Sequence, residues 1–468
     1  MPSPTSVATE LDSGAIPPGP KGLPRFGCLN GLLRNPMQFW LRIAREYGGI
    51  ARVPIKGRHV YLISDPELLY TLLITNRRKY RKNIRYKAAV DTFGAGLLLN
   101  EGEAWRRQRR ITQPAFKATY VSDQIPAMAA LVERTLDGWQ ASAQSGAVRD
   151  VDEDFLRLSQ LVAGHYLMGP GFDAIESEFY EAAIAIKDNW PLPPRNILAS
   201  YLPKSKAREQ RLDDAIRAIE QLLYGYFTEC RKHDFSDCGV LEMLVKSSRE
   251  QNDEFDDKSL RDQLLTLFFA GHETSATSLS WIHYLLSSHP DAYARVRSEV
   301  HENFSDRPRI GATVDQLEYT ERVINESLRL HSPIHSISRV AEEDDVIGGY
   351  AIPKGSMIYV SLYATHRLGS LWPDPDRFDP DRFIPEAVAA RPRFAFIPFA
   401  AGHRNCIGGP MAVAELKLVI AQIAERYRLE LAPGHRVVEA AGTTMYPRYG
   451  MKMSIHPARA ASEPARAV

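Results

Sequence analysis

The stretch FAFIPFAAGHRNCIGGPM, residues 394–411, decides how the rest of this 468-residue chain is interpreted. Its residues match the frame F-x-x-G-x-R-x-C-x-G at Phe399, Gly402, Arg404, Cys406 and Gly408. The cysteine comes just before a helical pattern, and a thiol at a helix N-terminus or beside cations loses its proton most easily. Backbone N–H groups donated to the sulfur would tune a bound metal, while glycines let the loop pass close to a flat cofactor. The stretch therefore predicts a metal-bound thiolate at Cys406.

An isolated cysteine before a helix is more often a buried apolar side chain than a ligand. Five matches in one frame weigh against that interpretation, and they resemble the haem-binding loop of the cytochrome P450 family. The resemblance implies that Cys406 is the axial ligand of haem b and that Arg404 contacts a haem propionate. It also implies that Phe399 and Gly408 belong to the cofactor-binding loop.

The composition is that of an ordinary globular protein. Lysine and arginine number 58 and aspartate and glutamate 57, and this net charge of +1 argues against general binding to nucleic acid. Four scattered cysteines are too few for a disulfide framework and indicate a reducing cytoplasm.

The sequence predicts one large domain with a short tail at each end. Residues 1–16 lack the basic start and apolar run of a signal peptide or membrane anchor, so we expect a disordered tail there. Residues 17–457 form the predicted domain, followed by a flexible tail at 458–468. No apolar run reaches the roughly eighteen residues of a membrane span. We expect a cytoplasmic monomer without a transmembrane anchor.

The segment GEAWRRQRRITQPAF, residues 102–116, places two anion-binding side chains on one helical face. Trp105 and Arg109 are four residues apart, so an indole N–H and a guanidinium project together. A charge run is more often a solvated surface, but in the cytochrome P450 family this W-x-x-x-R pair holds the haem propionates. The remaining arginines of the run are candidates for docking an acidic electron donor: Arg106, Arg107 and Arg110.

A long helix is predicted at about 257–288, carrying LLTLFFAGHETSATSLSW. Ala270 and Thr274 share one face, and Gly271 leaves space for a pocket beside them. The Thr274 hydroxyl is expected to bond an upstream carbonyl and open the helix locally. AGHET resembles the family's oxygen-activating A-G-x-[DE]-T motif, which implies that Glu273 and Thr274 organise the two protons that dioxygen cleavage consumes. Alone, such a pair in a helix is usually a surface acid beside a neutral residue.

Glu326 and Arg329, in INESLRLHSP, lie at i and i+3 and can pair on one helical face. A buried pair of this kind needs further partners. The resemblance identifies it as the E-x-x-R motif, whose third member is Arg382 in Pro380-Asp381-Arg382-Phe383. Arg377 is a less favoured rival. We expect this triad to be structural.

Strands are predicted after Pro333, with turns at Gly348-Gly349 and Lys354-Gly355. The resemblance implies that Arg339 in this region reaches a propionate, although a surface strand arginine is the alternative. The predicted substrate pocket is largely apolar, and its candidates are Phe93, Leu97, Leu98, Phe269, Ala270, Ile334, Ile337, Thr444 and Met445.

The sequence as a whole indicates a mainly α protein with small β-sheets, in the cytochrome P450 fold. The resemblance implies a haem-thiolate monooxygenase that uses O2 as co-substrate to hydroxylate or epoxidise a lipophilic small molecule. Fatty acids, terpenoids, steroids and polyketides are candidate substrates, with a slight preference for fatty-acid-like compounds. Electrons from NAD(P)H are expected through a separate ferredoxin or flavodoxin and its reductase. The alternatives are an H2O2-driven peroxygenase, a non-catalytic haem-based sensor and a thiolate-haem isomerase or dehydratase that does not depend on dioxygen.

Overall fold

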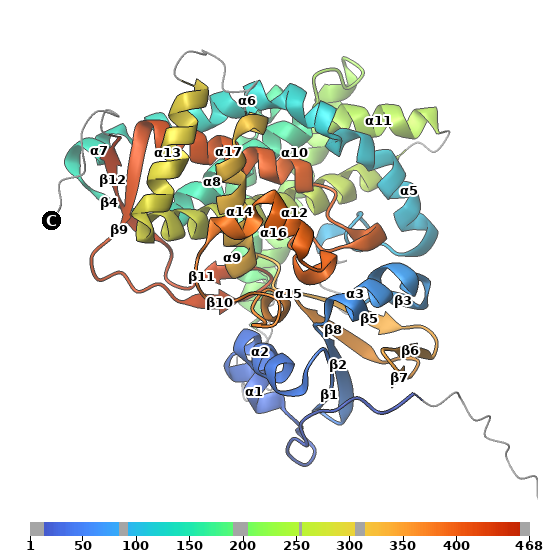
Figure 1. Ribbon diagram of the computed structural model, residues 1–468. Helices are drawn as coiled ribbons and strands as arrows, with labels where there is room; N and C mark the ends of the chain where they lie inside the picture. Colours follow the sequence, from blue (N-terminus) through green and yellow to red (C-terminus); the bar gives the residue numbers. More distant parts are fainter. Residues whose placement is uncertain (1–13, 84–91, 191–204, 252–254, 305–313, 459–468) are drawn as a thin grey trace, which may run out of the picture. The chain divides into compact units, whose positions relative to one another are not determined.

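The protein is represented by a computed structural model that describes residues 14–83, 92–190, 205–251, 255–304 and 314–458 (Figure 1). The chain divides into two compact units, each assembled from segments far apart in sequence. The first unit combines Met1–Asn83, Ser336–Pro375 and Arg391–Asn405, and the second combines Ile84–His335, Asp376–Ala390 and Cys406–Val468. The prediction of a mainly helical protein with small sheets is confirmed.

The first unit is built on a five-stranded sheet in the order β1-β2-β8-β5-β3. Figure 1 shows blue β1 and β2 beside orange β8 and β5, so strands from residues 50–63 and 336–361 share one sheet. The pairs are antiparallel except for β2 and β8, which run parallel. The strands of the unit are β1 (Ile50–Ile55), β2 (Arg58–Ile63), β3 (Tyr80–Lys82), β5 (Ser336–Ala341), β6 (Asp345–Ile347), β7 (Tyr350–Ile352) and β8 (Met357–Ser361).

Short helices accompany this sheet. The apolar residues of α2 lie on one face, which is buried. The Asn35 side chain caps the first turn, and Pro36 is tolerated there because the backbone N–H groups of a first turn have no partner within the helix. The helical segments are α1 (Leu29–Arg34), α2 (Pro36–Tyr47), α3 (Pro66–Tyr70), the π-turn η1 (Thr71–Thr75), α15 (Leu362–Thr365) and the 3₁₀ turns η2 (Arg77–Lys79), η9 (Arg393–Ala395) and η10 (Gly402–Arg404).

The second unit is predominantly helical. Its α-helices are α5 (Gly102–Thr112), α6 (Ala118–Asp137), α7 (Gln140–Ser145), α8 (Val151–Met168), α9 (Glu176–Asn189), α10 (Lys206–Arg231), α11 (Val240–Glu250), α12 (Asp257–Ser288), α13 (Pro290–Phe304), α14 (Glu318–Leu330), α16 (Pro385–Ala390) and α17 (Gly409–Arg426). Its 3₁₀ turns are η3 (Gln113–Phe116), η4 (Pro170–Ala174), η7 (Val314–Gln316) and η8 (Pro380–Phe383). Its strands are β4 (Val148–Asp150), β9 (Tyr427–Leu431), β10 (Glu439–Ala441), β11 (Met445–Pro447) and β12 (Lys452–Pro457).

Helix α12 is the central element of the second unit. Its 32 residues span about 48 Å at 1.5 Å per residue. The Asp256 side chain accepts a hydrogen bond from the Ser259 N–H at 2.8 Å and so caps the first turn. The helix packs along α8 and is buried on nearly all sides, including at polar positions. A helix buried in this way must find a partner for each polar side chain it carries.

Several expected boundaries coincide with observed ones. The predicted helix at 257–288 has the bounds of α12, and the stripe from Pro36 to Tyr47 forms α2. Ala15 falls in the segment expected to be a disordered tail, yet it forms a parallel β-bridge with Tyr350. Residues 1–13 of that segment, and the C-terminal tail after Ala458, lie outside the described residues. Within the described residues, no helix is long and apolar enough to cross a membrane.

Candidate haem site

The Cys406 sulfur lies just before α17. It accepts hydrogen bonds from the N–H groups of Gly408 and Gly409, at the start of that helix. Burial of the sulfur raises the pKa of the Cys406 thiol, although part of the residue is exposed. The two N–H groups and the positive charge of Arg109 oppose this rise in pKa. These are the groups that would stabilise a thiolate ligand.

The preceding part of the motif belongs to the first unit. Gly402 has φ +77°, and a Cβ there would stand 2.4 Å from the Leu73 carbonyl oxygen, so only glycine fits. Ala400 also has a positive φ of 56°, although it is not glycine. The predicted cofactor-binding residues Phe399 and Arg404 are half-buried.

Trp105 and Arg109 lie one turn apart on α5, as their spacing predicts. Trp105 is buried, and burial lowers the pKa of the Arg109 guanidinium. The negative charge of a Cys406 thiolate would raise the pKa of Arg109. This interaction indicates that Arg109 lies near the Cys406 sulfur. A shallow groove of about 380 Å³ runs along this helix and is lined by Trp105, Arg106, Arg109, Arg110, Gln113, Pro114 and Lys117.

The three arginines predicted to dock a donor differ in their contacts. Arg106 is exposed and pairs with Glu103 on the same helix. Arg110 donates to the Gln251 side chain at 2.6 Å, and the guanidinium of Arg107 lies 5.5 Å from the Phe255 ring centroid. Arg106 and Arg110 line the groove, whereas Arg107 does not.

Helix α12 has an uncovered stretch at 269–271 and again at 273–274, while His272 between them and the residues on either side are buried. Ala270 is exposed, and a Cβ built on Gly271 would meet no atom within 4 Å. The Thr274 hydroxyl lies 2.9 Å from the Ala270 carbonyl oxygen and 3.0 Å from that of Gly271. The expected back-bond is therefore present, but the helix remains α-helical to Ser288, so the expected local opening is wrong. The uncovered stretch is where a flat cofactor or substrate has room to approach α12.

Glu273 has a partner that its sequence neighbours do not reveal. The Thr444 hydroxyl donates to its Oε1 at 2.9 Å from the turn between β10 and β11. That turn is held by two backbone bonds of Met445, whose carbonyl accepts from Trp281 Nε1 at 3.1 Å and whose N–H donates to the Pro333 carbonyl at 2.8 Å. Thr444 was predicted as a pocket residue, and the structure adds that it orients the acidic side chain of AGHET.

Glu326, Arg329 and Arg382 come together in the second unit. Arg329 donates two hydrogen bonds to Glu326, at 2.6 and 2.7 Å, and both side chains are fully buried. Arg382 Nε lies 3.4 Å from Glu326 Oε1, which also accepts from the Asp379 N–H at 2.9 Å. The rival Arg377 has an exposed side chain, and only its carbonyl reaches Arg329.

Arg339 lies on β5 in the first unit. It is buried and donates to the Ser338 carbonyl at 2.9 Å, which argues against the alternative of a surface strand arginine. A guanidinium carries five N–H donors in a planar fork that matches a carboxylate, so a buried arginine at this strand is a candidate partner for an anion.

The predicted pocket residues fall into separate groups. Phe93 lies 4.9 Å from Phe269 and 5.0 Å from Trp190 between ring centroids, so these residues form one aromatic cluster. Leu97 and Met445 are buried, Ile334 is half-buried and Leu98 is exposed. Ile337 packs against the hydrophobic core of the first unit, so its side chain contributes to that core.

The sequence interpretation missed Glu415 on α17. This carboxyl is buried, and Ser275 Oγ, one residue after Thr274, donates to it at 2.7 Å. Burial raises the pKa of Glu415 to about 7, although the hydroxyls of Ser275 and Ser159 oppose the rise. A glutamate within the mostly apolar run AVAELKLVIAQIA was the available signal, because such a run predicts a buried helix.

The comparisons with known proteins agree with this geometry. The sequence profile of the family described as Cytochrome P450 matches residues 17–452. The chain belongs to the cytochrome P450 family. It is 32% identical over 455 residues to cyclooctatin synthase of Streptomyces melanosporofaciens, with 95% of each chain covered. It is 28% identical to pentalenene oxygenase of Streptomyces avermitilis, covering 91% of this chain and 94% of that protein.

Solved structures of P450 proteins share the fold. The haem domain of cytochrome P450DA superposes with a TM-score of 0.85 at 25% identity, covering 96% of this chain and 98% of that one. Cyanobacterial CYP120A1 with retinoic acid bound gives 0.83 at 25% identity, covering 95% and 100%. The chain is therefore a P450 monooxygenase of the kind that uses haem b and O2, with electrons from NAD(P)H through partners.

The residues present in each unit fit this cofactor. The second unit supplies a thiol whose sulfur accepts two N–H bonds, a cation beside it at Arg109, and the uncovered stretch on α12. The first unit supplies the buried guanidinium of Arg339 and the half-buried Arg404. A thiolate ligand and several cations are what an iron porphyrin with two propionates requires.

Proposed function

We propose that this P450 hydroxylates or epoxidises a terpenoid. The observation that carries the proposal is the aromatic cluster of Phe93, Phe269 and Trp190 next to the exposed Ala270 on α12. Rigid aromatic surfaces bury large apolar area without offering a charged partner. Such a surface suits a bulky hydrocarbon better than a molecule that must pair a carboxylate.

The relatives support the same substrate class. Their names refer to oxidation of cyclooctat-9-en-7-ol, pentalenene and carotene, and the first two proteins come from Streptomyces species. These comparisons favour terpenoids over the fatty-acid-like substrates that the motifs slightly favoured, and terpenoid-oxidising relatives recur among them.

Cys406, Trp105, Arg109, Arg339 and Arg404 are proposed to hold the haem. When bound, the haem–thiolate activates dioxygen for insertion into an unactivated C–H or C=C bond. The chain's part is to orient the substrate and to control protons. Arg109 and Arg339 offer guanidinium donors for the propionates, because their planar forks match carboxylate geometry.

Glu273 and Thr274 are proposed to deliver protons from the uncovered side of α12. The Thr274 hydroxyl donates to its own helix, so its lone pairs are available to accept from water. Glu273 is half-buried, and Thr444 holds one of its carboxylate oxygens. The other oxygen can take a proton from water and return it, while the fixed side chain keeps the same position between turnovers.

Electrons are proposed to come from a separate ferredoxin or flavodoxin. The groove along α5 supports this, because Arg106, Arg109, Arg110 and Lys117 line it and, within the described part of the chain, no acidic residue does. Acidic electron carriers are steered to such a surface by long-range attraction. We expect this encounter to weaken as salt rises.

The test is a spectral screen of the holoprotein followed by turnover. Terpene hydrocarbons and terpene alcohols are expected to shift the haem spectrum towards high spin, and lauric and palmitic acids are not. Reconstitution with a ferredoxin, its reductase, NAD(P)H and isotopically labelled dioxygen should place one labelled oxygen atom in the terpenoid. A spin shift with fatty acids alone would refute the substrate class.

The peroxygenase and sensor alternatives give different results in the same assay. A peroxygenase forms product with H2O2 at least as fast as with the reconstituted electron donors. A sensor binds terpenoids, shifts its spectrum and consumes no NAD(P)H above the rate without ligand. Product that depends on NAD(P)H and dioxygen excludes both.

A further inference from the structure

The first turns of α12 carry an unusual set of buried polar residues. Arg261, Asp262 and Gln263 are 5%, 2% and 0% exposed. Buried charges destabilise a protein unless they are paired and hydrogen-bonded. The partners of these three side chains therefore identify the segment that this part of α12 binds.

Two of these side chains bind the backbone of residues 92–97, which we call the strap. Asp262 Oδ2 accepts from the Ala95 N–H at 2.8 Å, and Gln263 Oε1 accepts from the Leu97 N–H at 2.8 Å. The two bonds lie two residues apart on the strap and one residue apart on α12. They fix the alignment of the strap against the helix, because a shift by one residue would break both.

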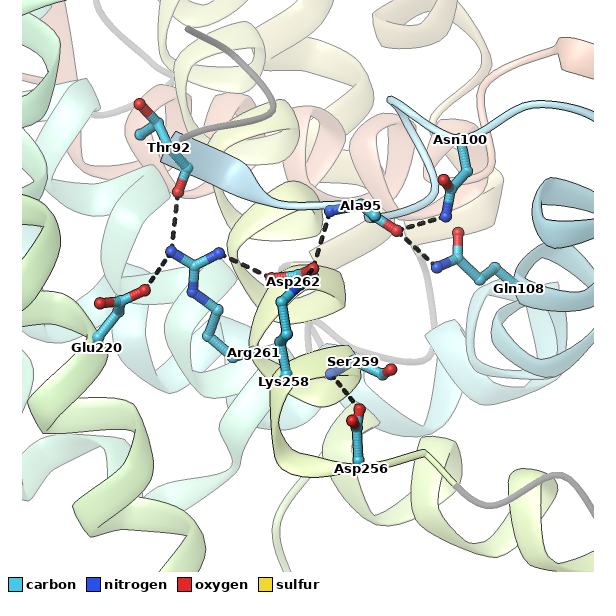
Figure 2. A network of polar contacts seen from close by, with 10 residues as sticks. All are labelled: Thr92, Ala95, Asn100, Gln108, Glu220, Asp256, Lys258, Ser259, Arg261 and Asp262. Carbon is cyan, nitrogen blue, oxygen red and sulfur yellow. Dashed lines mark hydrogen bonds and ion pairs between the residues drawn. The ribbon is translucent and has the colours of Figure 1, made fainter. Parts of the chain in front are cut away.

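Arg261 connects the strap to a third element. Its guanidinium donates to the Thr92 carbonyl at 3.0 Å, to Glu220 of α10 at 2.6 Å and to Asp262 at 2.7 Å. Figure 2 shows this side chain between the strap, α10 and α12, with Asp262 shared between Arg261 and Ala95. One buried cation thus pairs with two carboxylates and holds the beginning of the strap through the Thr92 carbonyl.

The strap packs too closely for any residue but glycine at two positions. A Cβ on Gly94, whose φ is +69°, would lie 2.0 Å from Asp262 Oδ1. A Cβ on Gly96 would lie 2.0 Å from Thr266 Oγ1. From the other side, Gln108 of α5 donates to the Ala95 carbonyl at 2.7 Å, so both backbone groups of Ala95 are held (Figure 2).

The strap carries the aromatic residue on which the proposed substrate site rests. Phe93 lies between Thr92, which Arg261 binds, and Gly94, which packs on Asp262. Its ring packs on Phe269, two turns along α12 from the polar cluster. The position of this ring is therefore determined by charges that do not touch the substrate.

We propose that Arg261, Asp262 and Gln263 are positioning residues that set ligand affinity by fixing Phe93 and Leu97 through the strap. This inference rests on the proposed substrate site beside Phe93 and Phe269. A purely structural cluster would change stability and leave the affinity for large ligands intact. A positioning cluster changes the affinity for ligands that reach Phe93 and spares smaller ones.

The experiment compares two haem-binding probes in full-length holoprotein. Clotrimazole is bulky and apolar enough to reach the aromatic cluster, whereas imidazole is too small to do so. Asp262→Asn leaves one accepting oxygen where the carboxylate has two, so it cannot serve both Arg261 and the Ala95 N–H. Lys258→Ala is the matched control, because its ammonium also pairs with Asp262 but is 70% exposed and contributes little.

We expect Asp262→Asn to raise the spectral dissociation constant of clotrimazole about tenfold, as is usual for the loss of a hydrogen bond to a charged group. The constant for imidazole should stay within about twofold, and Lys258→Ala should resemble the wild type. Hydrogen exchange of the Ala95 amide should accelerate in Asp262→Asn. If that variant does not fold, Gly94→Ala displaces the strap without changing α12 and should give the same pattern.

Two results would overturn the proposal. If Asp262→Asn accelerates exchange at Ala95 but leaves the affinity for clotrimazole unchanged, the three polar residues have only a structural role. Unchanged exchange at Ala95 in both Asp262→Asn and Gly94→Ala would mean that the contact with Asp262 does not hold the strap. Neither result depends on turnover, so failure here is distinguishable from failure of the proposed terpenoid oxidation.

Discussion

Replacing Glu415 tests how the second unit buries a carboxyl group. We expect the substitution to make the protein more stable at alkaline pH. The carboxyl is 3% exposed, and burial raises its pKa to about 7 from an ordinary value of 4.5. The folded state therefore keeps this proton over a range in which the unfolded chain has already lost it. The protonated carboxyl therefore contributes its full share to the free energy of unfolding below pH 4.5. This contribution is lost as the pH rises towards 7.

The expected size follows from the pKa difference. A rise of about 2.5 pKa units corresponds to about 3 kcal/mol, since each unit is worth 1.36 kcal/mol. Glu415→Gln keeps the shape and can still accept from Ser275, but it has no proton to lose. We expect the variant to resemble the wild type near pH 5 and to be more stable by about 2–3 kcal/mol at pH 8.

The assay is urea unfolding of the holoprotein at pH 5, 6, 7 and 8, with wild type and variant compared at each pH. Only the difference between the proteins matters. His272 and His283 have pKa values lowered to about 4 by burial, so both proteins lose stability in acid as these histidines become protonated on unfolding. Subtracting the two curves cancels that effect. Glu425→Gln, at an exposed position of the same helix, is the control and should show no such trend.

A difference between Glu415→Gln and wild type that stays constant from pH 5 to pH 8 would refute the reasoning. It would mean that the carboxyl is ionised in the folded protein at neutral pH. Infrared spectroscopy provides an independent check, because a protonated buried carboxyl has a C=O stretch that disappears on ionisation. We expect that band at pH 6, its loss by pH 8 and its absence from the variant.

Three further changes test other contacts. Glu326→Ala removes the carboxylate shared by the buried Arg329 and the half-buried Arg382, so it should cost about 3–5 kcal/mol. Reduced carbon monoxide spectra should then show little holoprotein, unlike those of Arg377→Ala at an exposed position. Thr444→Val removes the hydroxyl donated to Glu273, so peroxide released per NAD(P)H should increase; Thr444→Ser should retain wild-type coupling. Arg110→Glu should slow reduction by a ferredoxin at low salt, and the difference from wild type should shrink as ionic strength rises.

Local sequence patterns predicted the long elements well. Helix α12 has an N-capping aspartate and 32 residues without a proline or an early break, so its bounds could be read from the sequence. The pairing of β2 with β8 could not be predicted. These strands run parallel and are separated by nearly 300 residues, and no turn chemistry connects them. Only tertiary packing determines that pairing.

The site was predictable where motifs are contiguous and unpredictable where contacts are long-range. Cys406 and its two N–H donors lie within three residues, so the loop sequence already contains them. The hydrogen bond between Thr444 and Glu273 joins residues 171 positions apart. Burial also changes the meaning of a residue type: Glu415 looks like one more helical charge until its surroundings are known.

Helix α12 is buried on nearly all sides, so both its polar residues and its exposed residues are informative. In a helix exposed on one side, a polar residue is ordinary and an uncovered alanine carries no information. Here the helix is buried on nearly all sides, so each polar residue needs a partner and each gap in the cover is an exception. Arg261, Asp262 and Gln263 find their partners in the strap and α10, and Ser275 finds Glu415. The uncovered stretch at Ala270 and Gly271 is the exception, and it coincides with the AGHET motif. Packing and motif therefore identify the same face of α12 by independent reasoning.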